Sequence, residues 1–361
     1  MRSKPLLFIA IPVVAVIALG GVSVASSWRG AAADQRSETL ASLSTKVNQL
    51  AAEVEAERDA IIWYIAAGPD GRTGQIEGHV TPADKAKSAA QLQIVEQQER
   101  YTEPWVKTVT ASLAGFGSGY PLGVQAVARS VTSALRNLPQ LRNVALRTQI
   151  PAASVLAEYG GLVSTLLNFN DEVARIGSDP QFTSAADAMT AIARVEYEDS
   201  VQRAIVMYAL TAGTINPVLL DQYNASTADQ KADISEFQNF ATPSQAEMFS
   251  SVLARSLDDR VQSDEQTFIQ NTNRVTSTHI VPEDWYGSIS SVINANLKFG
   301  QAMATAAVDR AKALHERAIV SALVVGGIIL AVLLFSLIFA LYIGRSMTGP
   351  RRPLTLGQST A

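Results

Sequence analysis

The sequence predicts an all-α protein: two four-helix bundles flanked by two transmembrane helices. Three observations predict this fold. Apolar residues recur at spacings of three and four along most of the 361-residue chain, as they do in amphipathic helices. The alternation of apolar and polar residues that marks strands is nowhere sustained. Finally, two uncharged apolar blocks, near either end of the chain, are each long enough to cross about 30 Å of hydrocarbon.

The apolar block at 6–28 is the first expected transmembrane helix. Arg2 and Lys4 precede it, and Ser23-Val24-Ala25 resembles a cleavage site, so a removable signal peptide is an alternative interpretation. The apolar run is longer than a usual signal core, and Trp28 marks an interfacial end. These features favour an uncleaved span.

The block at 318–343 is the second expected span. Basic residues without acids lie outside both blocks, and such residues favour the cytoplasmic side of a membrane. We therefore expect a multi-pass protein of the cell membrane. In this topology residues 1–5 and 344–361 are cytoplasmic, and residues 29–316 are extracytoplasmic.

Composition excludes several classes of function. All 33 acidic residues lie between the two blocks, and so acidic a segment does not bind nucleic acid. The chain contains no cysteine, so disulfides, thiolate metal sites and cysteine nucleophiles are excluded. Its three histidines, His79, His279 and His315, are scattered without metal-ligand spacing. We find no catalytic, metal or cofactor motif, and expect no enzyme activity.

The first helix of the segment should cover about 34–68. Its apolar residues follow a heptad pattern: Leu40, Leu43, Val47, Leu50, Val54 and Ile61. This seam makes a homodimer reasonable, although it could equally serve a bundle within one chain.

Further helices follow along the chain, and proline, capping residues and glycine mark their ends. A proline lies near each predicted start, where its missing N–H costs little. Asn216 and Thr242 stand before prolines as caps, and Gly213 marks an end. Pro104 and Pro139 fall inside helical patterns, where they should kink or split the helix. The predicted helices are 82–115, 121–149, 151–177, 180–213, 216–240, 243–272 and 282–316.

A short internal repeat draws attention to two arginines. The segment from Glu57 to Gly68 resembles the segment from Gln202 to Gly213, and in each copy an arginine precedes the glycine by ten residues. Apolar neighbours turn Arg58 and Arg203 toward the packed side of their helices. A half-buried guanidinium needs an acceptor, and its planar fork suits a carboxylate or a planar oxyanion. The alternatives are a structural role, as an ion pair or as a side chain that snorkels to solvent, and a ligand site.

Four stretches resemble the nitrate- and nitrite-sensing family found in sensor histidine kinases of actinobacteria. They are the run Ala56-Glu57-Arg58 leading to Tyr64 and Gly68, the stretch 99–103 (Glu-Arg-Tyr-Thr-Glu), the run around Arg203, and Glu283-Asp284-Trp285 at the start of the last helix before a membrane span. The resemblance covers most of 30–316. It implies a sensor domain of two four-helix bundles that holds nitrate or nitrite between Arg58 and Arg203. Gln202 departs from the first copy, which has Glu57.

The tail departs further from that family. Residues 344–350 look like the start of a HAMP-type linker, and no phosphoacceptor or ATP-binding segment follows. The expected function is therefore a membrane-anchored signal-input module that binds a small anion and acts through a separate cytoplasmic signalling partner. The alternative is a ligand-independent ectodomain that binds other proteins or the cell envelope.

Overall fold

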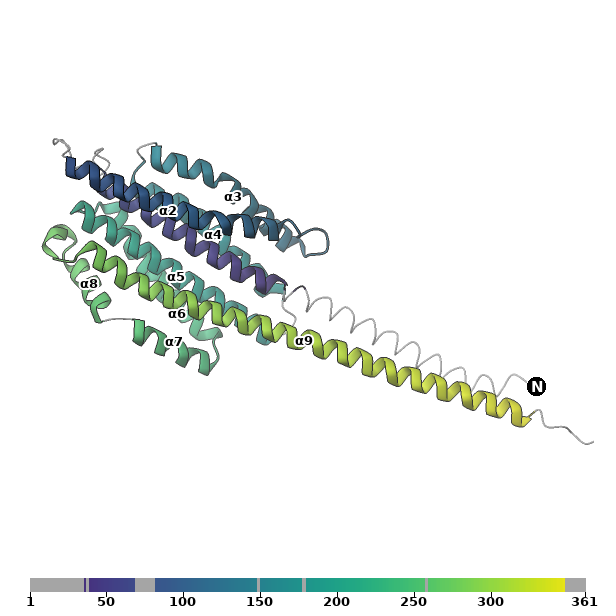
Figure 1. Ribbon diagram of the computed structural model, residues 1–361. Coiled ribbons are helices and arrows are strands. Elements are labelled where there is room, and N and C mark those ends of the chain that lie inside the picture. Colours follow the sequence, from purple (N-terminus) through teal and green to yellow (C-terminus); the bar gives the residue numbers. More distant parts are fainter. Residues whose placement is uncertain are drawn as a thin grey trace, which may run out of the picture. The chain divides into compact units, whose positions relative to one another are not determined.

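The computed structural model describes residues 36, 39–68, 82–147, 150–176, 180–256 and 259–347, and every regular element in these ranges is a helix. The prediction of an all-α protein is confirmed (Figure 1). An N-terminal helix at 39–67 is followed by α2 (Pro82–Leu113), α3 (Leu122–Arg147), α4 (Ala152–Ile176), α5 (Pro180–Ala212), α6 (Pro217–Phe240), α7 (Pro243–Ser256), α8 (Asp259–Gln270), the 3₁₀ turn η1 (Thr272–Ser277) and α9 (Pro282–Met347).

The helix ends follow from the residues that cap them. The Asn216 side chain accepts a hydrogen bond from the N–H of Leu219, 2.8 Å away, at the start of α6. Thr242 and Gln245 bond reciprocally at the start of α7, which satisfies two N–H groups that the helix leaves open. Gly213 adopts φ 72° after α5, a conformation that glycine takes without strain. These three predicted boundaries are confirmed.

Two expectations about the helices are changed by the structure. Helices α2 and α3 continue through Pro104 and Pro139, so neither proline splits its helix, and of the two expected effects only a kink is left. The stretch 243–272, predicted as one helix, is divided between α7 and α8, with residues 257–258 outside the described ranges.

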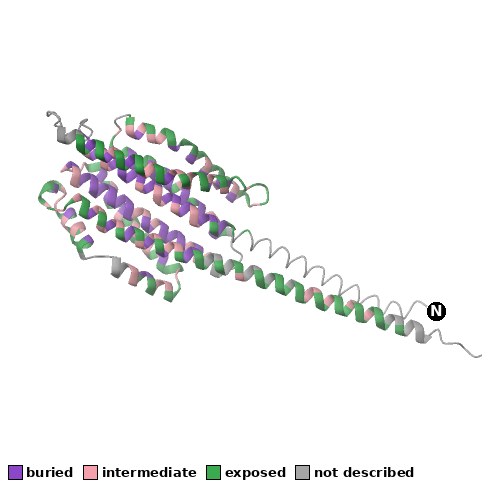
Figure 2. Cartoon of the chain, viewed as in Figure 1, coloured by how far each residue is buried: buried purple, intermediate pink, exposed green. Residues whose placement is uncertain are grey.

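The helices up to Ala311 form one compact unit, Arg36–Ala311. Its main core takes residues from the N-terminal helix and from α2 through α6, α8 and α9. The two predicted groups of four helices therefore share a continuous core. Figure 2 shows that buried residues concentrate along the N-terminal helix and α5, the two helices at the centre of this unit.

The predicted heptad seam lies inside this core. Leu40, Val47, Leu50, Val54 and Ile61 are all 0% exposed. The seam therefore stabilises the packing of a single chain and is not available to a second copy. It gives no support to the expected homodimer.

Helix α9 also enters the second compact unit, which contains Lys312–Ala361. Within it, residues Ile319–Phe339 have a mean hydropathy of 2.9 and none of them is buried. Among the described residues this is the one helix long and apolar enough to cross a membrane. The first expected span at 6–28 and the tail beyond Met347 lie outside the described residues.

Candidate functional site

The two central helices face each other with polar stripes. On α5, Glu196, Ser200 and Arg203 are spaced by four and three residues, which places them on one face. On the N-terminal helix, Glu55 precedes Arg58 by three residues, so these two side chains also share one face. All five side chains belong to residues that are at most 5% exposed.

Arg58 and Arg203 meet on one carboxylate, that of Asp59. Arg58 donates from Nε to Asp59 Oδ1 over 2.8 Å, with Nη2 also 2.8 Å from Oδ1. Arg203 donates from Nε to Asp59 Oδ2 over 2.8 Å, with Nη2 2.7 Å from Oδ2. Each guanidinium thus directs the same edge at a different oxygen of one carboxylate. The structure brings together the two arginines that the sequence singled out.

Each arginine of the pair also donates a hydrogen bond to a serine hydroxyl. Arg58 Nη2 donates to Ser200 Oγ over 2.6 Å, and Arg203 Nη1 donates to Ser290 Oγ of α9 over 3.1 Å. Arg58 Nη1 has no hydrogen-bond partner within the described part of the chain, although Arg58 is 0% exposed. A buried donor without a partner is costly, so this atom is a point at which a ligand could bind.

Two aromatic rings cover the guanidinium planes. The ring centre of Tyr197 is 5.7 Å from the central carbon of Arg58, and that of Tyr286 on α9 is 5.1 Å from the central carbon of Arg203. These distances allow cation–π attraction. Burial lowers the pKa of both arginines, but the combined attraction of Asp59, Glu55 and the neighbouring tyrosine outweighs it, so that the pKa of each is raised and both stay charged.

Glu55 and Glu196 are the other carboxyl groups of the site. Burial raises the pKa of Glu55 to about 7, against the opposing attraction of Arg58. Burial, followed by the charge of Glu55, raises the pKa of Glu196 well above its ordinary value. Both Glu55 oxygens and Oε1 of Glu196 lack a hydrogen-bond partner in the described ranges.

The charges of the site do not balance when Glu55 and Glu196 are both protonated, which their raised pKa values favour. The two guanidinium groups then share Asp59 as their one hydrogen-bonded carboxylate in the described ranges, and one positive charge is left over. A buried charge without a counterion is unfavourable. A monovalent anion would neutralise it.

A second buried cluster lies beside this one on the N-terminal helix. Glu57 accepts from Arg142 of α3 through both of its oxygens, from Nε and Nη2, each over 2.8 Å. The hydroxyl of Tyr159 on α4 donates to Glu57 Oε1 over 2.9 Å. In this cluster one carboxylate and one guanidinium form a bidentate pair. We assign it a structural role.

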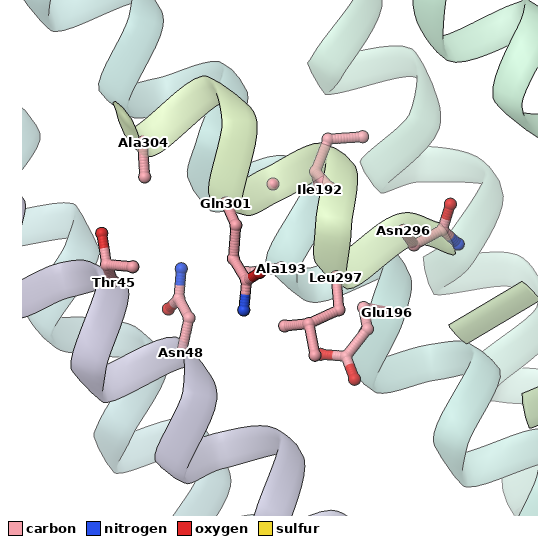
Figure 3. A pocket seen from close by; sticks show the side chains of 10 residues that line it. Thr45, Asn48, Ile192, Ala193, Glu196, Asn296, Leu297, Gln301 and Ala304 are labelled. Atoms are coloured by element: carbon pink, nitrogen blue, oxygen red, sulfur yellow. The ribbon is translucent and has the colours of Figure 1, made fainter. Parts of the chain in front are cut away.

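A small cavity adjoins Glu196 between the N-terminal helix, α5 and α9 (Figure 3). Its volume is about 10 Å³, which is about the space that one water molecule needs. In Figure 3, Thr45 and Asn48 extend from the N-terminal helix toward Gln301 of α9, whereas Asn296 points away. Asn296 donates instead to Asp199 over 2.7 Å. The cavity is too small for an oxyanion.

Sequence reasoning found the arginines but missed their neighbours. Asp59 could have been found by comparing the two copies of the repeat, because the position after the arginine is Asp59 in the first and Ala204 in the second. Gln202, the departure from Glu57, donates to Ser226 Oγ over 3.5 Å. Glu57 has Arg142 as its partner, which explains why only the first copy carries a carboxylate there.

The remaining candidates are accounted for only in part. His279 is exposed, as expected of a surface histidine. His79 lies outside the described residues, as does the side chain of His315. No group of side chains in the described ranges could hold a metal ion.

The fold and the site define a helical-bundle domain with a buried arginine pair at its centre. The chain belongs to the nitrate and nitrite sensing family, whose sequence model matches residues 49–308. The solved structure of the NasR transcription antiterminator is similar, with a TM-score of 0.59 at 15% identity, over 79% of this chain and 71% of that chain. At that identity the likeness shows the fold alone. No curated protein matches the chain.

Proposed function

We propose that this chain is a membrane-anchored signal-input module that binds nitrate or nitrite between Arg58 and Arg203. The anion would bring the net charge of the whole site, two guanidinium groups and the Asp59 carboxylate, to zero. The membership of this chain in the nitrate and nitrite sensing family supports a role in sensing these anions.

The observation that carries the proposal is the convergence of two buried guanidinium groups, one from each copy of the repeat. They approach within hydrogen-bonding distance of the same small planar anion, the Asp59 carboxylate. Planar donor edges of this kind suit nitrate and nitrite, which are planar and carry one delocalised charge. The excess positive charge and the unpaired Nη1 of Arg58 favour an added anion over a purely structural ion pair.

Helix α9 gives the site a route toward the membrane. Arg203 bonds Ser290 of α9 and lies under Tyr286 of the same helix. The helix also carries the apolar stretch Ile319–Phe339. A ligand that changes the contacts of Arg203 would favour one state of α9 over another, which is what signal transmission requires. A separate cytoplasmic partner would bind one state of α9 more tightly than the other.

Binding is tested by calorimetric titration of the full-length chain in detergent micelles with nitrate and nitrite at constant ionic strength. We expect saturable binding that Arg58→Ala and Arg203→Ala abolish. The matched control is Arg194→Ala. This arginine is on α5 too, but it pairs with Asp171 and Glu236 at the surface, so its loss should leave the affinity unchanged. Circular dichroism confirms that each variant is folded.

Two results would contradict the proposal. Binding that survives both arginine substitutions would place the ligand elsewhere. Absence of binding to the wild-type chain would favour the ligand-independent interaction protein. Variants that do not fold are replaced by Arg58→Lys and Arg203→Lys, which keep the charge and lose the planar fork.

Membrane topology is tested with single cysteines, because the chain has none of its own. Ser235→Cys on α6 is exposed and should react with an impermeant maleimide on intact cells. Ser359→Cys in the tail should react only after the cells are opened. The reverse pattern, or a chain that does not sediment with membranes, would overturn the topology.

A further inference from the structure

The Asp59 carboxylate occupies the place in which the arginine pair would hold an anion. Its two oxygens are divided between the two arginines, one to each Nε and Nη2 edge. A nitrite ion has the same bent arrangement of two oxygens on a planar centre, and nitrate adds a third oxygen in the plane. A carboxylate in this position therefore resembles the expected ligand in shape and charge.

The site is also closed around Asp59. Arg58 is 0% exposed, Asp59 2% and Arg203 5%. The Nε and Nη2 edges of both arginines are already used, and Ser200 contributes a further contact of 3.4 Å to Asp59 Oδ2. An incoming anion can reach both edges only where the carboxylate now lies.

Asp59 is attached to only one of the two helices. It follows Arg58 directly on the N-terminal helix, and the equivalent position of α5 is Ala204. The link between the N-terminal helix and Arg203 therefore depends on one side chain. A rotation of that side chain would free both guanidinium edges without unwinding either helix.

We infer that Asp59 is a resident occupant of the anion site, which nitrate or nitrite displaces. The inference rests on the proposed function and adds the mechanism by which that site is regulated. The carboxylate links Arg203 to the N-terminal helix when no anion is present. It also competes with every incoming anion, so weakly bonding anions do not displace it.

A resident competitor lowers the apparent affinity by the fraction of molecules in which the site is open. If Asp59 occupies the site in more than about nine molecules of ten, its removal should tighten binding roughly tenfold or more. Asp59→Asn removes the charge and keeps the shape. Asp59→Ala leaves a space between the arginines that formate, the smallest carboxylate, would fit.

The experiment compares wild type, Asp59→Asn and Asp59→Ala as full-length chains in detergent micelles, titrated calorimetrically with nitrate, nitrite and formate. Sodium gluconate keeps the ionic strength constant. We expect wild type to bind nitrate or nitrite and to ignore formate, Asp59→Asn to bind roughly tenfold tighter, and Asp59→Ala to bind formate as well. Asp171→Asn, a carboxylate paired with Arg194, is the matched control and should not change the affinity.

The outcomes separate the two proposals. If wild type binds the anion and folded Asp59→Asn binds it with equal or lower affinity, Asp59 is not a competitor, and the proposed function remains intact. If none of the three chains binds nitrate or nitrite, the proposed function is wrong, and so is the inference that rests on it. If neither variant folds, infrared difference spectra of wild type labelled with ¹³C-aspartate decide. A carboxylate band that moves when the anion is added supports displacement, and an unchanged band excludes it.

Discussion

Two buried charge clusters lie on the same turn of the N-terminal helix, and they differ in how their charges are paired. Glu57 has one arginine, Arg142, which approaches it through two bonds of 2.8 Å, and a tyrosine hydroxyl. Asp59 has two arginines, each from a different copy of the repeat. In the first cluster one cation serves two carboxylates, because Arg142 Nη1 also lies 3.5 Å from Glu103 Oε2. The second has a cation in excess.

The difference separates structural from functional use of buried arginine. A matched bidentate pair holds three helices together, and an added anion would find no free charge there. The pair that shares Asp59 has an unpaired donor, Nη1 of Arg58, and two neighbouring carboxyl groups whose pKa values burial raises. Burial alone therefore does not identify a ligand site. The charge left over after pairing does.

The largest expected effect is that of Arg142→Ala. It leaves Glu57, whose side chain is 0% exposed, as a buried charge without its cation, at a cost of about 3–5 kcal/mol. Urea denaturation should measure this loss of stability, and added nitrate should not restore it. The double variant with Glu57→Gln should recover most of the loss. Restoration by nitrate would contradict the structural role.

Arg203→Lys should weaken anion binding with a smaller effect on the fold. Lysine keeps the charge but cannot present two N–H groups in one plane. Losing one charge-assisted hydrogen bond corresponds to about tenfold to a hundredfold in dissociation constant. Calorimetry measures the change. An unaltered dissociation constant would show that a point charge is sufficient and that the planar fork has no role.

Anion binding should weaken as the pH rises through the pKa of Glu55. Below about 7 this carboxyl is protonated, and the site keeps its excess positive charge. Above it, Glu55 ionises and supplies the negative charge itself. We expect the dissociation constant to increase by about tenfold between pH 6 and pH 8. Glu55→Gln should bind with little dependence on pH, and an equally steep profile in that variant would assign the titration to another group.

The stability of the unliganded chain should fall over the same interval. Burial raises the pKa of Glu55, Asp199 and Glu265 to about 7. The folded state therefore binds more protons than the unfolded state from about pH 4 upward. This stabilisation is complete below the unfolded pKa values and is lost as the pH passes 7. Thermal unfolding should therefore give a lower Tm at pH 8 than at pH 6. A Tm that rises over this interval would contradict these shifts.

The smallest expected effect is that of Tyr159→Phe. It removes a 2.9 Å hydrogen bond to Glu57 while Arg142 stays in place, so the cost should be about 1 kcal/mol. The affinity for nitrate should not change, because Tyr159 contacts the structural cluster alone. A weaker affinity in a folded Tyr159→Phe would show that the two clusters are coupled.

The sequence by itself determined the helices and the two arginines. Helix ends at Asn216, Thr242 and Gly213 depend on local hydrogen bonds and local backbone conformation, which neighbouring residues decide. The seam from Leu40 to Ile61 depends on helical period alone. Arg58 and Arg203 could be found because the repeat places them at equal distances from a glycine and turns them toward the packed side.

Only the tertiary structure decided what those arginines contact. Glu196, Ser200 and Ser290 lie on α5 and α9, more than a hundred residues along the chain from Arg58, and no local pattern pairs them. No local pattern pairs Glu57 with Arg142 either, because the two residues belong to different helices. Partner choice and charge balance arise when α5 packs against the N-terminal helix. Burial then determines which carboxyl groups keep their protons and which charge is left for a ligand.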